Sequence, residues 1–181
     1  MNIILAVIGL VISIAGLLIT IFTISQRRKK SWRQILREID LLKGKLAGKF
    51  NYIISFADGG LIAADLLHIK GDSQIPVLSL NLKIMRNNKG SKLVKVLTGK
   101  DSLLFLKNKK ILLIDDVVQT GRNMEAVVIY LTDEVGIDRE NIITAVLGKP
   151  KGITGFVVDY YGFEYSTNTI ELPWGIVPRH S

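Results

Sequence analysis

The most constraining feature of the sequence is the segment 109–124, which reads KKILLIDDVVQTGRNM. Four apolar, β-favouring residues precede two adjacent carboxylates, Asp115 and Asp116, and a polar loop with Thr120 and Gly121 then leads into a helical pattern. This pattern predicts a buried strand that carries acids at its carboxyl end and is followed by the start of a helix. Ligands of open α/β sheets bind at the carboxyl ends of strands, and helix N-termini favour anions. We therefore expect the segment to hold a polyhydroxylated, phosphorylated ligand.

Strand and helix patterns alternate on both sides of this segment. Strands are expected at residues 50–55, 76–82, 111–114, 141–147 and 156–161, and helices at 61–67 and 122–135. Such alternation is typical of a parallel, open α/β sheet flanked by helices. The 181 residues provide for one such domain and an appendage.

The first 26 residues form the appendage. Residues 2–25 contain no charged side chain, and a helix of this length crosses a hydrocarbon core of about 30 Å. The basic residues 27–30 follow directly, so the positive-inside rule places the N-terminus outside and the rest of the chain in the cytoplasm. A cleaved signal peptide would carry its charge before the apolar stretch. We therefore predict a single-pass helix over residues 1–26, retained in the cell membrane.

Residues 27–49 are predicted to form a basic amphipathic juxtamembrane segment. Apolar residues recur at helical spacing, at positions 35, 36, 39, 42 and 46, with Lys and Arg on the other side. Two interpretations remain open together. The basic side can bind anionic headgroups, at about 1 kcal/mol per charge, or the helix can belong to the core with a solvated basic face. The remaining domain would then span residues 50–181.

The composition excludes several kinds of chemistry. The chain contains no Cys, which rules out disulfides, thiolate catalysis and Cys-ligated metals. Its two His residues, His68 and His180, are far apart in sequence, which makes a His-based zinc site or a Ser-His triad improbable. The net charge of +8 is concentrated at residues 27–49 and 83–110. No aromatic ladder accompanies these charges, so no nucleic-acid partner is expected.

A second motif precedes the acidic one. Residues 50–55 predict a strand, and Asp58, Gly59 and Gly60 lie in the turn before the next helix. Glycines let backbone N–H groups approach a phosphate closely. A strand, a Gly-Gly turn and a helix together describe an anion-receiving loop.

Residues 111–123 resemble the phosphoribosyl pyrophosphate (PRPP) motif of type I phosphoribosyltransferases. The resemblance implies that Asp115 and Asp116 bind the ribose 2′- and 3′-hydroxyls of PRPP, directly or through Mg²⁺. It also implies a cradle for the 5′-phosphate made of Thr120, Gly121, Arg122 and Asn123. Within this catalytic segment, Gln119 stands where the purine-salvage branch usually carries an Asp that handles the base proton, and Gln cannot act as a general base.

The same resemblance assigns two further regions. The turn with Asp58, Gly59 and Gly60 takes the place of the pyrophosphate-binding loop, with Asp58 where a basic residue is common. The Lys- and Asn-rich residues 83–110 take the place of the flexible loop that closes over the active site.

The C-terminal tail resembles the hood of xanthine-guanine phosphoribosyltransferases. Residues 172–174, Leu-Pro-Trp, match the Phe-Pro-Trp of that hood, and Tyr161 lies in the strand before it. In this register Thr169 occupies the position of the base-stacking aromatic residue, and Trp174 keeps the hood tryptophan. Tyr161, Thr169 and Trp174 are therefore the expected base and hood residues.

The leading hypothesis is a membrane-anchored phosphoribosyltransferase-like enzyme that uses Mg²⁺ and PRPP and transfers to a purine-like nucleobase. The alternative keeps the fold without the chemistry, as a membrane-tethered PRPP or nucleotide sensor or assembly module. A third hypothesis is an oligomerising structural protein, because small residues in the apolar segment could pair two copies as a homodimer. A response-regulator receiver domain, which also carries adjacent acids, is disfavoured because too few residues follow the acids.

Overall fold

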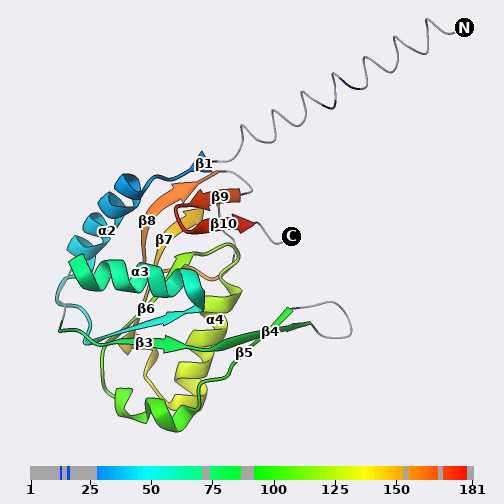
Figure 1. Cartoon of the computed structure of the whole chain (residues 1–181). Coiled ribbons are helices and arrows are strands. Elements are labelled where there is room, and N and C mark those ends of the chain that lie inside the picture. The colour runs from blue at the N-terminus through cyan, green and yellow to red at the C-terminus, as the bar shows by residue number, and fades with distance from the viewer. Residues whose placement is uncertain are drawn as a thin grey trace, which may run out of the picture. The chain divides into compact units, whose positions relative to one another are not determined.

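A computed structural model describes residues 13, 16, 28–70, 74–86, 92–152, 155–166 and 169–178. The chain divides into two compact units. The larger unit is Trp32–Ser166, and the smaller unit combines Met1–Ser31 with Thr167–Ser181. Figure 1 shows the helices and strands of the chain with their labels.

The larger unit is built on a sheet of five strands in the order β3-β2-β6-β7-β8, and every neighbouring pair is parallel. The strands are β2 (Tyr52–Phe56), β3 (Val77–Leu80), β6 (Ile111–Val117), β7 (Ile142–Pro150) and β8 (Tyr160–Tyr165). β6 is the central strand, which explains its apolar run, because a strand covered on both faces buries successive side chains. The predicted parallel α/β sheet is confirmed.

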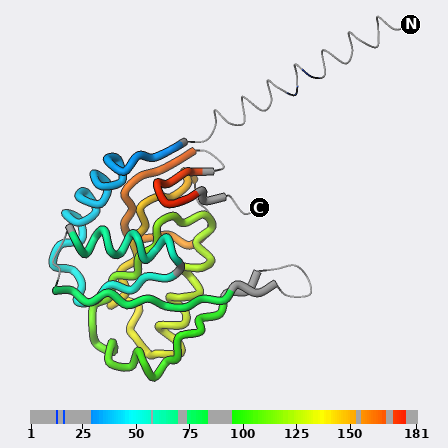
Figure 2. The backbone as a smooth tube through the Cα atoms, in the orientation of Figure 1, coloured from blue at the N-terminus to red at the C-terminus, as the bar shows by residue number. Residues whose placement is uncertain are grey.

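Helices cover both faces of this sheet, and the chain path alternates between strand and helix (Figure 2). On one face α3 (Ala57–Lys70) packs against β2 and β6, and α2 (Trp32–Leu46) packs against α3, β7 and β8. The other face carries the 3₁₀-helix η1 (Lys100–Leu106) and α4 (Arg122–Ile129), which continues as the π-helix η2 (Tyr130–Val135). The short 3₁₀-helix η3 (Arg139–Asn141) leads into β7.

The helix predicted within residues 27–49 is part of the core of the larger unit. Its apolar face, formed by Ile35, Ile39, Leu42 and Leu46, is at most 1% exposed. Of the two interpretations left open by the sequence, the core helix with a solvated basic face is therefore present. The larger unit begins at Trp32, whereas the sequence-based division starts the domain at Phe50.

The predicted membrane segment, residues 1–26, lies outside the described residues apart from Ser13 and Gly16, which are helical. Within the part of the chain that the structure describes, no helix combines the length and the apolar character needed to cross a bilayer.

Several element boundaries differ from the sequence-based predictions. The strand expected at 76–82 ends at Leu80, and an antiparallel hairpin of β4 (Leu82–Arg86) and β5 (Lys92–Val96) follows it. The strand expected at 156–161 begins only at Tyr160. α3 begins at Ala57, so Gly59 and Gly60 lie in its first turn and not in a turn before it. These shifts arise because sheet pairing and packing, rather than local periodicity, set the ends of elements.

The smaller unit contains a three-stranded sheet made from both ends of the chain. β1 (Arg28–Lys29) pairs in parallel with β9 (Thr169–Leu172), and β9 pairs antiparallel with β10 (Gly175–Pro178). The Lys30 N–H donates to the Glu171 carbonyl at 2.9 Å, and Lys29 Nζ lies 2.9 Å from Glu171 Oε1. The C-terminal hairpin is thus held by the residues that follow the apolar N-terminal segment in sequence.

Candidate active site

The two motifs predicted from sequence meet at the carboxyl ends of β2 and β6. These strands are neighbours, with Ser55 in register with Ile114. A Cβ atom added to Gly59 would collide with the carboxylate of Asp116, and one added to Gly60 would come within 3.0 Å of Asp115 Oδ1. The first turn of α3 therefore approaches both carboxylates so closely that it leaves no room for a side chain.

Asp115 and Asp116 are the last polar residues of β6, and both are partly buried. Burial raises the pKa of Asp115 well above its usual value, and the charge of Asp116 raises it further. The N–H of Asp116, which donates to Asp115 Oδ1 at 2.9 Å, acts in the opposite direction. The Val117 N–H donates to Asp116 Oδ1 at 2.7 Å. Two crowded carboxylates in this setting suit ligands that donate hydrogen bonds, or a hard cation.

The loop after β6 leads into the start of α4. Gly121 has a left-handed backbone, with φ of 77°, and its carbonyl accepts the N–H of Glu125 at 2.8 Å. Arg122, which is exposed, and Asn123, which is partly buried, follow in the first helical turn. The N–H groups of a first turn lack partners within the helix, and Gly121 has no side chain with which to cap them. The helix start can therefore receive a phosphate.

A segment that sequence reasoning missed supports this loop. A Cβ atom on Gly121 would lie 2.6 Å from Phe156 Cβ and 3.0 Å from the Phe156 carbonyl oxygen. A Cβ atom on Gly155 would collide with the Thr120 carbonyl oxygen. Gly155 and Phe156 thus pack directly against Thr120 and Gly121. The one signal in the sequence is the glycine, which the strand prediction at 156–161 left unused.

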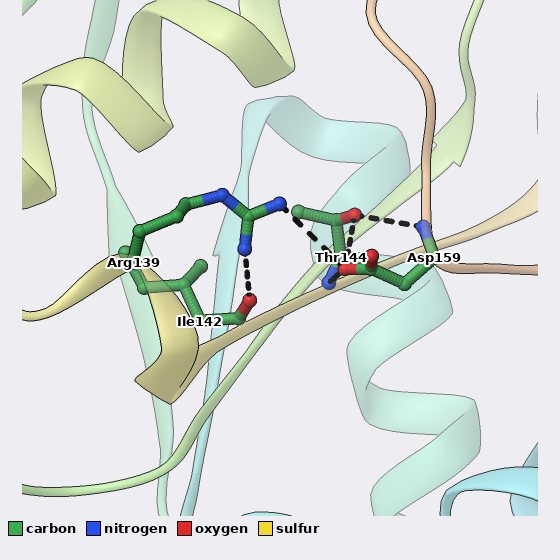
Figure 3. A network of polar contacts seen from close by, with 4 residues as sticks. All are labelled: Arg139, Ile142, Thr144 and Asp159. Atoms are coloured by element: carbon green, nitrogen blue, oxygen red, sulfur yellow. Dashed lines mark hydrogen bonds and ion pairs between the residues drawn. The ribbon is translucent and has the colours of Figure 1, made fainter.

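The segment that carries Phe156 is fixed at its far end by a polar network (Figure 3). Asp159 Oδ2 accepts both the N–H and the hydroxyl of Thr144, each at 2.8 Å, and the Asp159 N–H donates to Thr144 Oγ1 at 3.0 Å. Arg139 lies 3.9 Å from the same carboxylate and donates to the Ile142 carbonyl at 2.6 Å. The network holds the residues before β8 against β7.

Hydrogen bonds also fix the loop residue Val118. Its N–H donates to the Gly148 carbonyl at 3.0 Å, and its carbonyl accepts the Tyr165 hydroxyl at 3.2 Å. The loop between β6 and α4 is thus held by both β7 and β8.

A cationic side chain that sequence reasoning missed lies near the end of β7. Lys149 Nζ is 3.2 Å from Glu164 Oε1 and 4.1 Å from the centroid of the Tyr161 ring. The preceding residue, Gly148, is in register with Val117, immediately after the two acids of β6. Lys149 therefore lies on the strand beside the acidic one, and Tyr161, a predicted base residue, lies on β8, the next strand of the sheet. Neither charge nor local pattern distinguishes Lys149 from the many other lysines of the sequence.

The remaining predicted residues are divided between the two units. Asp58 is exposed in the first turn of α3, and Gln119 is partly buried between β6 and α4. Thr169 begins β9, opposite Pro178 of β10, and Trp174 lies partly buried in the turn between these strands. Thr169 and Trp174 thus belong to the smaller unit.

Within the described residues, no group of three or more His, Cys, Asp or Glu side chains could hold a metal ion. The protein donors that fit Mg²⁺ are the adjacent carboxylates of Asp115 and Asp116, which supply the hard oxygens this ion prefers. A Mg²⁺ ion held there would take its other ligands from water and from a bound phosphate or hydroxyl.

The sequence of this chain matches the model of one known protein family. The model of the phosphoribosyl transferase domain family matches residues 21–178 of the chain. The chain belongs to the phosphoribosyltransferase family. The match includes α2, both motifs of the site, and the strands of the C-terminal hairpin.

Solved structures give the same result. A purine phosphoribosyltransferase from Pyrococcus horikoshii is 31% identical, with a TM-score of 0.67, over 86% of this chain and 99% of that one. A hypothetical protein from Neisseria gonorrhoeae with bound ppGpp is 24% identical, with a TM-score of 0.68, over 82% and 89%. A Helicobacter pylori xanthine-guanine-hypoxanthine phosphoribosyltransferase shares the fold at 17% identity, with a TM-score of 0.66, over 82% and 94%. A search of curated protein sequences gave no significant match.

The family and its purine-specific relative support PRPP-dependent phosphoribosyl transfer as the general activity of this phosphoribosyltransferase. Phosphoribosyltransferases generally use Mg²⁺ together with PRPP. The approach of Gly59 and Gly60 to the two acids is the structural feature of this chain that agrees with that activity.

Proposed function

We propose that this phosphoribosyltransferase transfers the phosphoribosyl group of PRPP to a purine-like nucleobase and releases pyrophosphate. It would act at the cytoplasmic side of the cell membrane, anchored by residues 1–26. The observation that supports the chemistry is the close approach of Gly59 and Gly60 to Asp115 and Asp116, beside a helix start suited to a phosphate. The anchor is supported by the uncharged N-terminal sequence and the basic residues after it.

In this proposal the ribose lies over the end of β6. Asp115 and Asp116 accept hydrogen bonds from the 2′- and 3′-hydroxyls, because carboxylates form strong, charge-assisted bonds with hydroxyl donors. When Mg²⁺ is bound, it neutralises negative charge on the pyrophosphate and ribose oxygens. The acids and the first turn of α3 thus fix the sugar so that its C1 atom faces the acceptor.

The two phosphate ends of PRPP bind to backbone groups on either side of the acids. The 5′-phosphate lies at the start of α4, where Thr120, Gly121, Arg122 and Asn123 donate hydrogen bonds. The pyrophosphate lies at the first turn of α3, where backbone N–H groups lack partners within the helix and can donate to it. The carboxylate of Asp58 would repel pyrophosphate unless a cation lies between them.

The acceptor base lies toward β7 and β8. Lys149 can donate a hydrogen bond to an acceptor oxygen of the base, and it lies three residues after Val146, the β7 partner of Asp115. A purine-like base is supported by the 31% identical purine phosphoribosyltransferase and by the similarity of the tail to purine-specific relatives. Tyr161, whose ring centroid lies 4.1 Å from Lys149 Nζ, belongs to this proposed base site. The hood assignment of Thr169 and Trp174, which lie in the smaller unit, rests on the resemblance of the tail alone.

A second candidate function is PRPP or nucleotide binding without turnover. The observation that favours it is Gln119, a partly buried residue in the loop between β6 and α4. A carboxamide cannot accept the proton that an acidic residue could accept from the base. A membrane-tethered sensor would need the ribose and phosphate contacts but not this proton transfer.

Calorimetry followed by a turnover assay distinguishes the two functions. The full chain, purified in detergent, is titrated with PRPP and Mg²⁺, and pyrophosphate release is then measured with hypoxanthine, guanine, xanthine, adenine and uracil. The enzyme proposal predicts PRPP binding and turnover with at least one purine. Binding without turnover on any base supports the sensor. Failure to bind PRPP contradicts both.

A further inference from the structure

A cavity of the larger unit lies far from the acids, at the amino ends of β2 and β3. Its volume is about 540 Å³, and its walls come from the end of α2, the turn after it, the last turns of α3 and the residues before β3. β2 begins here at Tyr52 and ends at Phe56, next to the first turn of α3. The cavity is therefore separated from the candidate active site by the length of β2 and α3.

Most of the cavity wall is apolar and rigidly packed. Leu46 and Ile53 are 1% exposed and Leu67 is 3% exposed, so each belongs to the core of the unit. Sites for small molecules typically have volumes of about 300–1,000 Å³ and mainly apolar walls with a few polar groups. The size and the lining of this cavity fit that description.

The polar groups of the cavity can all donate hydrogen bonds. Nδ1 of His68 is buried and has no hydrogen-bond partner among the described residues. Lys43, an exposed residue of α2, lines the same cavity, and its side chain ends in an ammonium group that can donate three hydrogen bonds. The Asn51 carboxamide oxygen accepts the Lys110 N–H at 3.1 Å, which leaves its NH₂ group as the end that can serve a ligand. In the described part of the lining there is no acidic side chain.

We propose that this cavity binds a small amphiphilic anion, with a flat or branched apolar body and one carboxylate. The body would fill the space between Leu46, Ile53 and Leu67. The carboxylate would pair with the ammonium group of Lys43 and accept a hydrogen bond from the NH₂ group of Asn51.

The probe for this site is 4-(trifluoromethyl)benzoate, detected by ¹⁹F NMR with the full chain. We expect saturable binding at one site, and weaker binding of the neutral analogue 4-(trifluoromethyl)benzamide. Lys43→Gln should weaken benzoate binding about tenfold or more, because it removes a charge-assisted hydrogen bond. The matched control is Arg37→Gln, which removes the same charge from an exposed position of α2 outside the cavity and should change the affinity less than twofold.

A second variant fills the cavity instead of changing its charge. Ala47 lines the cavity and is exposed, so Ala47→Trp should occupy the space without disturbing the core. We expect it to abolish benzoate binding while thermal unfolding stays within a few degrees of the parent protein. His68→Phe, which removes a buried ring nitrogen without a partner, should raise the unfolding temperature.

Three results would overturn the proposal: no saturable binding to the parent chain, equal losses in Lys43→Gln and Arg37→Gln, or binding that survives in a folded Ala47→Trp variant. PRPP titrations of the same preparations report on the proposed enzymatic function separately, so either idea can fail without the other.

Discussion

The first four residues of β6 and the two acids that follow them belong to one strand but lie in different surroundings. Ile111, Leu112, Leu113 and Ile114 are 0% exposed, between helices on both faces of the sheet. Asp115 and Asp116 crowd each other beneath a helix turn that has no side chains at Gly59 and Gly60. The apolar half stabilises the fold, whereas the acidic half holds charges where burial disfavours them. The buried apolar residues around the acids therefore supply the stability that keeps this binding site folded.

The largest effect on folding is expected in the apolar half. Leu113→Ala removes a fully buried side chain that packs against α4 and should lower the free energy of unfolding by about 2–5 kcal/mol. Chemical denaturation measures this change. The control is Leu41→Ala in α2, where the side chain is 52% exposed and the change should stay within about 0.5 kcal/mol. Below its unfolding temperature, Leu113→Ala should retain its affinity for PRPP. A large loss of affinity in the folded variant would show that the two halves of β6 are not separate in role.

The largest effect on binding is expected where α3 meets the acids. In Gly59→Ala the new methyl group would collide with Asp116, so the carboxylate must move. We expect calorimetry to show PRPP affinity reduced by about 10- to 100-fold, the loss of one charge-assisted hydrogen bond or more.

Gly44→Ala is the matched control for this change. Gly44 lies in α2, and an added Cβ would meet no atom within 4 Å. This variant should keep its PRPP affinity and gain up to about 1 kcal/mol of stability, since Ala favours helices over Gly. Unchanged affinity in Gly59→Ala would contradict the assignment of the site.

A smaller effect is expected at the phosphate loop. Gly121→Ala and Gly48→Ala both place a side chain at a left-handed residue, with φ of 77° and 70°. The strain should cost each variant about 1–2 kcal/mol. Gly48 faces open space, whereas Gly121 faces Phe156, so Gly121→Ala should lose additional stability and PRPP affinity as well. Equal losses of stability and affinity in the two variants would remove the proposed role of Phe156 in supporting the loop.

The smallest expected effect is a gain in stability when the charge of one of the two acids is removed. Burial and the charge of Asp116 raise the pKa of Asp115, so the ionised form of Asp115 destabilises the folded protein. Asp115→Asn should therefore raise the unfolding temperature of the ligand-free protein at neutral pH by about 2–4 °C, or about 1 kcal/mol. Differential scanning calorimetry measures this shift.

The pH dependence of this change in unfolding temperature shows whether charge or packing causes it. Asp115 is protonated in both states below its usual pKa of 3.8, so the variant and the parent should then have similar stability. The advantage of the variant should appear as pH rises from there through the raised pKa of the folded state. A constant advantage at all pH values would point to packing rather than charge.

The sequence predicted the centre of this fold well because the relevant signal is local. The apolar run of residues 111–114 indicates a strand that is buried on both faces of the sheet. The two acids and the loop with Thr120 and Gly121 follow this run directly in the chain. The parallel sheet followed from the alternation of patterns. The start of α3 was placed too late, because Asp58, Gly59 and Gly60 resemble a turn in isolation, whereas in the fold they belong to the first helical turn, with both glycines packed against the acids of β6.

Features that depend on distant contacts could not be predicted. Phe156 supports Gly121 across a large separation in sequence, and Lys149 lies beside the acids only because β7 is paired with β6. The pairing of β1 with β9 joins the two ends of the chain, which neither end signals on its own. Local patterns describe strands and helices, but not which of them become neighbours.

The central claim is that Asp115 and Asp116 form the ribose site of a phosphoribosyltransferase. The most direct test is calorimetry of the full chain carrying both Asp115→Asn and Asp116→Asn, titrated with PRPP and Mg²⁺ under the conditions used for the parent protein. We predict that the parent binds PRPP and that the double variant, folded and at least as stable, shows no detectable binding. Binding of PRPP by the double variant with the affinity of the parent would contradict the assignment.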